Sequence, residues 1–308
     1  MKRWLIVGAV VAALAVTGAG AWLAFGRGTP AASSPPTASS PPTASGSAAA
    51  SGSPATAPTP ALALIPLPAG AGHFTRAPLP RLVRGPRSRA VPILMYHLIG
   101  DPPPGEPYPD LFVSLHDFAA QMRYLEAHGY TAVTLGRLFA CWHGRGRLPA
   151  KPIVLSFDDG YRSDWRYAAP ILQRIGWPAV LNLCMNAVGP HRDLPVALVH
   201  GLVRAGWELD DHTLTHPDLT TLDAAGLHRE IFVSRAVIQR LTGQRVSFFC
   251  YPSGAYDATV VSAVRRAGFL GATTTNEGLA TRTDPYTLPR VRVHRAMSLA
   301  AFAQALTA

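Results

Sequence analysis

The chain has 308 residues and a formal net charge of +10, because 28 Lys and Arg residues outnumber 18 Asp and Glu residues. The Arg residues are scattered and no nucleic-acid-binding motif accompanies them, so we expect no nucleic-acid partner. Attraction to an anionic wall polymer or membrane surface is the expected use of the charge. Three widely separated cysteines, Cys141, Cys184 and Cys250, indicate neither a metal knuckle nor a redox pair.

The N-terminus has the features of an export signal or a membrane anchor. Lys2 and Arg3 precede an uncharged apolar run over residues 4–25. Ala19-Gly20-Ala21 offers a small-residue cleavage site, whereas an uncut run of this length could span a bilayer. By the positive-inside rule the body of the protein lies outside the cytoplasm in either case. We therefore expect residues 1–27 to be a signal peptide or membrane anchor, and the protein to be membrane-anchored or secreted to the cell envelope.

A polar tether is predicted next. No charged residue occurs from Gly28 to Gly72, and Ser-Pro-Pro-Thr-Ala-Ser is repeated at 34–39 and 40–45. A segment rich in Pro, Ser, Ala and Thr cannot bury a core and forms an extended, semi-stiff linker. We expect residues 28–88 to be a disordered linker and residues 89–308 to form a catalytic domain.

Strands and helices are predicted to alternate through this domain. Short apolar segments typical of strands occur at 93–96, 131–133, 153–157, 179–184, 207–209, 246–251, 270–274 and 291–293. Amphipathic helices separate them, with a capping box formed by Ser114 and Asp117 before the first and a cap at Ser298 before the last. This alternation predicts an α/β fold with a parallel sheet, and seven or eight such units close most economically into a barrel.

Two motifs carry the candidate chemistry. Asp158 and Asp159 lie in Ser156-Phe-Asp-Asp-Gly160, and His212 and His216 follow about fifty positions later. A spacing of four places both imidazoles on the same side of a helix or helical turn, whereas neighbouring carboxylates at a strand end project apart. Asp159, His212 and His216 would bind a metal through two histidines and one carboxylate, with positions open to water and substrate. Asp158 then remains available as the base. Either motif alone can be a turn or a solvated face, but the two together favour a metal site.

These motifs resemble signatures of the polysaccharide deacetylases, carbohydrate esterase family four. Residues 156–160 resemble the TFDDG signature, residues 212–216 resemble HTxxH, and Phe249-Cys-Tyr-Pro-Ser-Gly254 resembles the third signature. Val91–His97 and Leu288–Val293 resemble the opening and closing strands of secreted members that act on poly-N-acetylglucosamine or peptidoglycan. The resemblance extends from about Val91 to the C-terminus and implies an irregular (β/α) barrel of about seven units.

The resemblance also implies roles for individual residues. Asp158 would be the general base that takes a proton from the attacking water, and Asp159, His212 and His216 would bind a divalent metal. Zn²⁺ suits this ligand set best, although cobalt, nickel or iron would also fit. The backbone N–H of Tyr251 would stabilise the oxyanion of the tetrahedral intermediate.

Two departures from the family pattern concern the base and the acid. Many members have an Arg in the third signature that orients the base, but here Cys250 stands near that position, so another group must hold Asp158. The usual C-terminal Leu-x-His is not plainly present, and His294 is the nearby candidate for the general acid. His97 could instead line the site or support it from behind.

We expect a monomeric, metal-dependent hydrolase that removes N-acetyl groups from an N-acetylglucosamine-containing polysaccharide, either cell-wall peptidoglycan or an exopolysaccharide. The same attack by water would cleave an ester, so an O-acetyl esterase is an alternative. The departures at Cys250 and His294 leave a catalytically weak glycan-binding relative as a further alternative.

Overall fold

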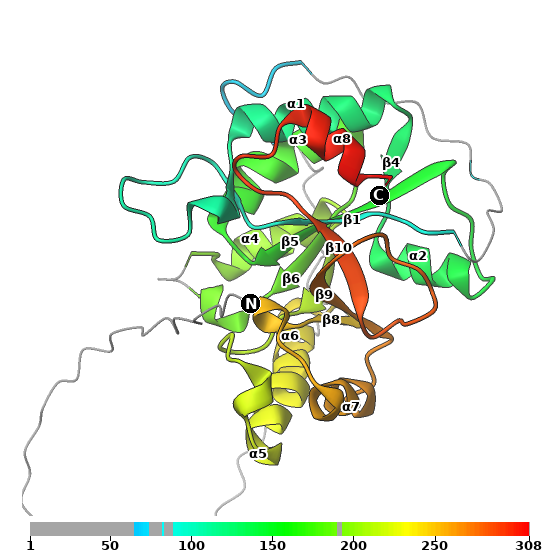
Figure 1. Cartoon of the computed structure of the whole chain (residues 1–308). Helices are drawn as coiled ribbons and strands as arrows, with labels where there is room; N and C mark the ends of the chain where they lie inside the picture. The colour runs from blue at the N-terminus through cyan, green and yellow to red at the C-terminus, as the bar shows by residue number, and fades with distance from the viewer. Residues whose placement is uncertain (1–64, 74–81, 83–88, 190–192, 308) are drawn as a thin grey trace, which may run out of the picture. The chain divides into compact units, whose positions relative to one another are not determined.

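The computed structural model describes residues 65–73, 82, 89–189 and 193–307. Parallel strands form a closed barrel at its centre (Figure 1). Around the barrel the strands follow in the order β1 (Ile93–Tyr96), β10 (Leu288–Arg292), β9 (Gly271–Glu277), β8 (Phe248–Cys250), β7 (Glu208–Asp211), β6 (Val180–Leu183) and β5 (Lys151–Asp159). Pairing of β1 with β5, from Ile93 opposite Val154 to Tyr96 opposite Phe157, closes it. The predicted (β/α) barrel of about seven units is confirmed.

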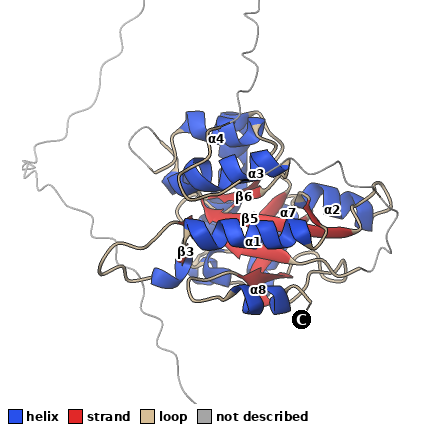
Figure 2. Ribbon diagram, turned by 90° about the horizontal axis from the view of Figure 1, so that it is seen from above, coloured by secondary structure: helices blue, strands red, loops and turns tan. Residues whose placement is uncertain are grey.

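Helices surround this barrel (Figure 2). They are α1 (Leu115–Ala127), α2 (Leu135–Trp142), α3 (Ala169–Ile175), α4 (Val196–Arg204), α5 (Ala224–Leu227), α6 (Ser234–Thr242), α7 (Ala258–Arg266) and α8 (Leu299–Ala305). The predicted caps are present: Ser114 Oγ accepts the Asp117 N–H at 3.0 Å, and Ser298 Oγ accepts the Ala301 N–H at 3.1 Å.

Short elements complete the fold. The short strand β4 (Tyr130–Ala132) pairs with the start of β5, and β2 (Leu98–Ile99) pairs with β3 (Phe112–Val113). Two helical turns have π geometry, η2 (Asp164–Ala168) and η5 (His228–Val233). Single 3₁₀ turns occur at η1 (Pro109–Leu111), η3 (Met185–Ala187), η4 (Leu219–Thr221) and η6 (Pro252–Gly254).

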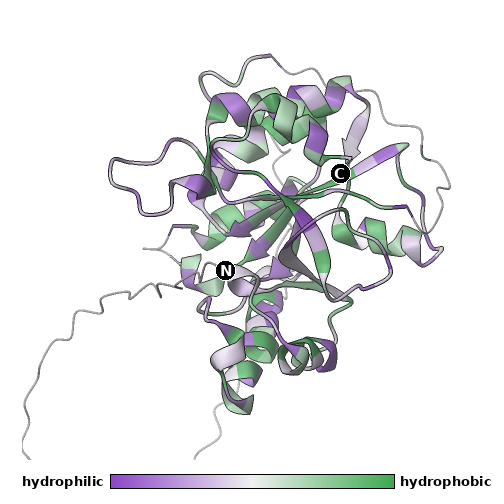
Figure 3. Ribbon diagram, viewed as in Figure 1, coloured by the Kyte–Doolittle hydropathy of each residue, from purple (hydrophilic) through white to green (hydrophobic). Residues whose placement is uncertain are grey.

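The inside of the barrel is layered, since alternate residues of each strand face inward. Near the start of the strands the layer is apolar and packs against α2, where the Phe139 and Phe248 rings lie 4.6 Å apart. Its strand residues are Ile93, Val154, Val180, Phe248 and Leu288. Two residues further along, the corresponding positions of β5, β6, β8 and β10 are Ser156, Asn182, Cys250 and Arg290, all buried. Figure 3 shows hydrophobic residues running through the central strands, and this polar layer interrupts them towards the carboxyl ends.

Residues 65–73 pack against the catalytic domain, although they fall within the predicted disordered linker 28–88. Ile65 and Leu67 contact the hydrophobic core, and Ala71 is fully buried. The Ile65 N–H donates to Gln173 Oε1 at 2.9 Å, and Arg123 Nη1 donates to the Ala71 carbonyl at 3.1 Å. The predicted linker boundary is therefore wrong at this segment, because large apolar side chains, Ile65 and Leu67, occur here after a stretch dominated by Ala, Ser, Thr and Pro.

Residues 1–64 lie outside the described residues, and with them the predicted signal or anchor and most of the predicted linker. Among the helices that the structure describes, none combines the length and the apolar character needed to cross a membrane.

Candidate active site

The two sequence motifs meet at the carboxyl ends of the barrel strands. Asp159 ends β5, and His212 follows β7 directly. Asp159 Oδ1 lies 3.4 Å from His212 Nε2 and 3.5 Å from His216 Nε2. The structure therefore brings together the three side chains that were predicted to bind a metal.

These distances can be compared with what a metal requires. Four ligands at about 2.1 Å around a tetrahedral ion lie about 3.4 Å from one another. The two separations from Asp159 Oδ1 match this value. His212 Nδ1–H donates to the Cys250 carbonyl at 2.8 Å, so Nε2 is the nitrogen that faces Asp159 and is placed to bind an ion. Burial alone would lower the pKa of His212, but the neighbouring Cys250 and Asp159 outweigh it and raise that pKa, so an ion that binds here displaces a proton from Nε2. The donor set and its geometry fit a zinc-type divalent metal.

The histidine pair lies on a loop and not on a helix. Thr213 and His216 both have positive φ angles, 70° and 60°. This left-handed backbone, uncommon outside glycine, turns the chain so that both imidazoles face Asp159. Burial and the neighbouring His212 lower the pKa of His216, which keeps its ring neutral, as a metal ligand must be.

Asp158 points inward and forms a buried ion pair with Arg290. Arg290 Nη1 donates to Asp158 Oδ1 at 2.8 Å, and Nη2 donates to Oδ2 at 2.7 Å. Asn182 Nδ2 donates a further bond to Oδ1 at 2.7 Å. Burial alone would raise the pKa of Asp158, but the charge and hydrogen bonds of Arg290 outweigh it and hold that pKa well below its usual range. Asp158 is therefore ionised, as a base must be.

Arg290 is the group that sequence reasoning could not identify as the holder of Asp158. It lies 132 residues after Asp158 and reaches it across the barrel from β10. Cys250 makes room for it, with Sγ 3.4 Å from Arg290 Nη2. The sequence signal that could have identified it is an Arg within the apolar segment Leu288–Val293. A buried charge there is costly unless it is paired, so a carboxylate partner could have been expected.

The two candidate acids lie in different surroundings. His97 Nε2 is 3.9 Å from Asp158 Oδ2, and burial lowers the pKa of His97 despite the nearby carboxylates. His294 is partly exposed, and its carbonyl accepts the Met297 N–H at 3.1 Å. Within the described residues its ring makes no hydrogen bond or ion pair, so the geometry places His97, and not His294, beside the base.

The Tyr251 N–H is not free for the predicted oxyanion role. It donates to the Thr273 carbonyl at 3.2 Å, within the pairing of β8 with β9. The expectation for Tyr251 is corrected here, because a ladder bond consumes its single donor. Ser253, two residues further on, is exposed with φ 53°, and its N–H has no partner among the residues described.

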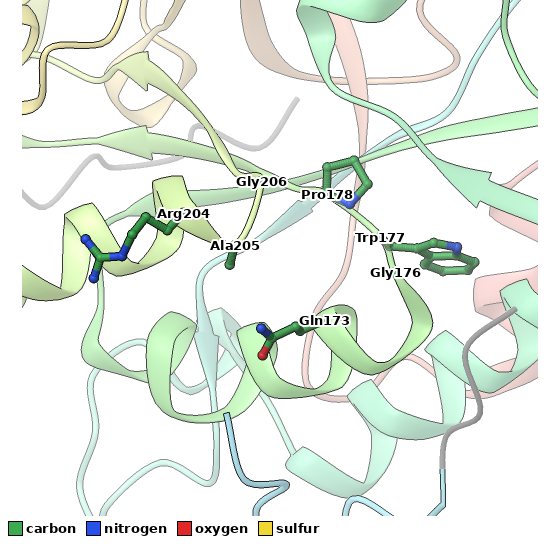
Figure 4. Close-up of a pocket in the computed structure, with 7 residues that line it drawn as sticks. All are labelled: Gln173, Gly176, Trp177, Pro178, Arg204, Ala205 and Gly206. Atoms are coloured by element: carbon green, nitrogen blue, oxygen red, sulfur yellow. The ribbon is translucent and has the colours of Figure 1, made fainter. Parts of the chain in front are cut away.

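Two other features do not compete with this site. Asp158, His212 and Cys250 also lie close enough to share an ion, but the Arg290 guanidinium already occupies the space beside Asp158 and Cys250 and repels a cation. A surface hollow lies before β6 and β7, at the opposite end of the barrel strands (Figure 4). It is lined by Gln173, Gly176, Trp177, Pro178, Arg204, Ala205 and Gly206.

Comparison with known proteins gives a consistent result. A family profile described as polysaccharide deacetylase matches residues 145–272. The deacetylase PplD of Streptococcus pyogenes, solved with acetate, is 26% identical with a TM-score of 0.67, over 72% of this chain and 100% of that one. The deacetylase homologue BA0330 of Bacillus anthracis is 30% identical with a TM-score of 0.64, over 71% of this chain and 70% of that one.

A curated relative has a named substrate. The poly-beta-1,6-N-acetyl-D-glucosamine N-deacetylase of Escherichia coli K12 is 26% identical over 60% of this chain and 34% of that protein. The (β/α) barrel, the paired motifs at its carboxyl end and these similarities agree, and the chain belongs to the polysaccharide deacetylase family.

Proposed function

We propose that this protein is a metal-dependent hydrolase that removes N-acetyl groups from an N-acetylglucosamine-containing polysaccharide. The observation that carries the proposal is the meeting of Asp159, His212 and His216 at ligand spacing beside an ionised, buried Asp158. When bound, a divalent ion, most suitably Zn²⁺, would polarise the acetyl carbonyl and raise the acidity of the water beside it.

Proton transfer is assigned to Asp158 and His97. Asp158 Oδ2 lies 3.9 Å from His97 Nε2 and accepts one bond from Arg290, whereas Oδ1 accepts bonds from both Arg290 and Asn182. Asp158 takes the proton of the attacking water and passes it to the neutral His97 ring, which is the stronger base. His97 then protonates the leaving nitrogen, so the C–N bond breaks and acetate and a free amine are released.

The oxyanion of the tetrahedral intermediate needs a donor that has no other partner. The exposed Ser253 N–H meets this requirement, and it follows the β8 strand whose Cys250 carbonyl contacts His212. We assign the oxyanion contact to Ser253 in place of Tyr251. A main-chain donor is insensitive to side-chain replacement, so Ser253→Ala and Ser253→Gly, which both retain the N–H, should keep turnover within about threefold, and a loss of about 10²-fold or more in both variants would contradict the assignment.

The substrate class is supported by the Escherichia coli relative, which by its name acts on poly-beta-1,6-N-acetyl-D-glucosamine. Peptidoglycan, which also contains N-acetylglucosamine, remains within the proposal. The basic, apolar N-terminal sequence supports a location outside the cytoplasm, either anchored to the membrane or secreted to the envelope. Arg290 weighs against a catalytically weak relative, because it supplies the cation that Cys250 lacks.

Acetate release from N-acetylglucosamine oligomers, peptidoglycan and O-acetylated xylan tests this function. We expect release from at least one N-acetylated glycan, its loss on chelation and its return with added Zn²⁺. Asp158→Asn should reduce turnover by about 10²–10⁴-fold and retain the metal, because the amide keeps the shape but cannot accept a proton. His212→Ala combined with His216→Ala should lose both metal and activity. Release from the acetylated xylan alone would identify an O-acetyl esterase, and no release from any glycan would identify a glycan-binding relative.

A further inference from the structure

The loop that carries the two histidines contains four consecutive backbone N–H groups, each satisfied by a side chain. The Thr213 N–H donates to Asp211 Oδ1 at 2.9 Å, and the His216 N–H donates to Thr213 Oγ1 at 2.9 Å. The two between them, of Leu214 and Thr215, both donate to one oxygen of Glu230, Oε2, at 3.0 and 2.9 Å. Successive N–H groups that converge on one point form an anion-binding concavity of the main chain.

Glu230 fills this concavity and is fully buried. Its other oxygen, Oε1, accepts the Thr215 hydroxyl at 3.0 Å and lies 3.3 Å from Arg229 Nε, whose side chain is 65% exposed. A carboxylate buried this completely is stable only when its oxygens are satisfied, and here the satisfying donors belong almost entirely to the histidine loop.

The backbone that presents Glu230 is irregular. Residues His228–Val233 form the π-helical turn η5, inserted between α5 and α6. A π turn widens the helix by one residue per hydrogen-bonded ring and shifts the direction of its side chains, and such turns are often found at functional sites. On α6, the Ser234 hydroxyl donates to Asp211 Oδ1 at 2.6 Å, so this helical segment also contacts the residue before His212.

We propose that Glu230 is a positioning residue for the metal, which acts by fixing the left-handed turn that aligns His216 with His212 and Asp159. This inference rests on the proposed metal site. Without the Glu230 carboxylate, the Leu214 and Thr215 N–H groups lose their shared acceptor. The two residues that lie between the strained positions Thr213 and His216 are then no longer held, and the turn can relax. The metal ligands themselves would remain in the chain but would no longer be held at ligand spacing.

Zinc affinity of the purified protein, measured by competition with a chromogenic chelator, tests this role. Glu230→Gln should raise the zinc Kd by about 10–100-fold, as for other groups that orient metal ligands. Arg229→Gln is the matched control, because it removes an exposed partner of Glu230 without touching the loop, and it should leave the Kd within about threefold. Glu230→Ala should lose affinity in the same way and regain part of it in formate, since a small carboxylate can occupy the vacated concavity.

The outcomes separate the possible failures. A zinc Kd equal to that of the unmodified protein in both Glu230 variants would overturn the role of Glu230 and leave the metal site intact. Zinc binding that is absent from the unmodified protein, or unchanged in the His212→Ala, His216→Ala double variant, would overturn the metal site and this inference together. A lower unfolding temperature of Glu230→Gln in chelator, with an unchanged zinc Kd for the folded protein, would assign Glu230 to stability alone.

Discussion

Replacement of Arg290 by Met tests the internal ion pair directly. The guanidinium donates two bonds to Asp158, one to Ser156 Oγ at 3.1 Å and one to the Thr274 carbonyl at 2.7 Å. Met fills similar space and donates none of them. Asp158, only 3% exposed, would keep the Asn182 amide as its remaining strong donor. Removal of one partner of a buried pair leaves an uncompensated charge, and we expect a loss of about 3–5 kcal/mol in unfolding free energy at neutral pH.

The loss should depend on pH in a defined direction. In the unmodified protein the pKa of Asp158 is lowered, so the stability from the pair is present above the unfolded pKa of about 3.9 and is lost as the pH falls below it. In Arg290→Met, burial dominates and raises the pKa of Asp158. The difference in stability between the two proteins should therefore be largest near neutrality and shrink as the pH falls through the raised pKa of Asp158 in the variant, so it should already be smaller at pH 4 than at pH 7. For the same reason, the acid limb of the activity profile should move to higher pH in the variant.

Urea denaturation at pH 7 and pH 4, with Asp158→Asn as the second mutation of a cycle, measures these effects. In the Asp158→Asn background the cost of Arg290→Met should fall by about 1–3 kcal/mol, because no charge is left unpaired. Additive costs, or an equal loss at both pH values, would refute the reasoning and indicate that Arg290 contributes only packing. Arg290→Lys is a useful comparison, since it keeps the charge but not the paired donors.

Three further predictions concern the acid, the domain boundary and the metal. His97→Ala should slow amide hydrolysis by about 10²-fold or more and spare hydrolysis of an aryl acetate, whose leaving group needs no proton. His294→Ala should change neither rate, and the reverse pattern would return the acid role to His294. A chain that begins at residue 65 should have a free energy of unfolding about 2–4 kcal/mol higher than one that begins at residue 89, because it retains the apolar contacts of residues 65–73. Equal midpoints of urea denaturation would contradict the packing of this segment. Because protons compete with zinc for His212 and His216, bound zinc measured by elemental analysis after dialysis should be retained near neutral pH and released as the pH falls, and a zinc content that does not depend on pH would contradict the ligand assignment.

Several features could be read from the sequence because they depend on neighbours in the chain. Short apolar segments indicated each barrel strand and amphipathic patterns indicated helices between them, and the caps at Ser114 and Ser298 followed from side-chain chemistry within one turn. The meeting of Asp159, His212 and His216, the predicted metal-binding residues, also belonged to this class, since parallel strands bring their carboxyl ends to one edge whatever the details of packing. Composition likewise predicted a tether over residues 28–88, and within the part of it that the structure describes, apolar Ile65, Leu67 and Ala71 pack against the domain.

Other features depend on which residues face each other across the barrel, and local patterns do not contain that information. Arg290 became the partner of Asp158 only when β10 closed against β1 and both side chains pointed inward. His97 became the ring beside the base because β1 pairs with β5, and the Tyr251 N–H was consumed because β8 pairs with β9. Each of these contacts joins residues that are 22 to 132 positions apart in the chain. Closure of the barrel and the register of its strands decide which donor meets which acceptor.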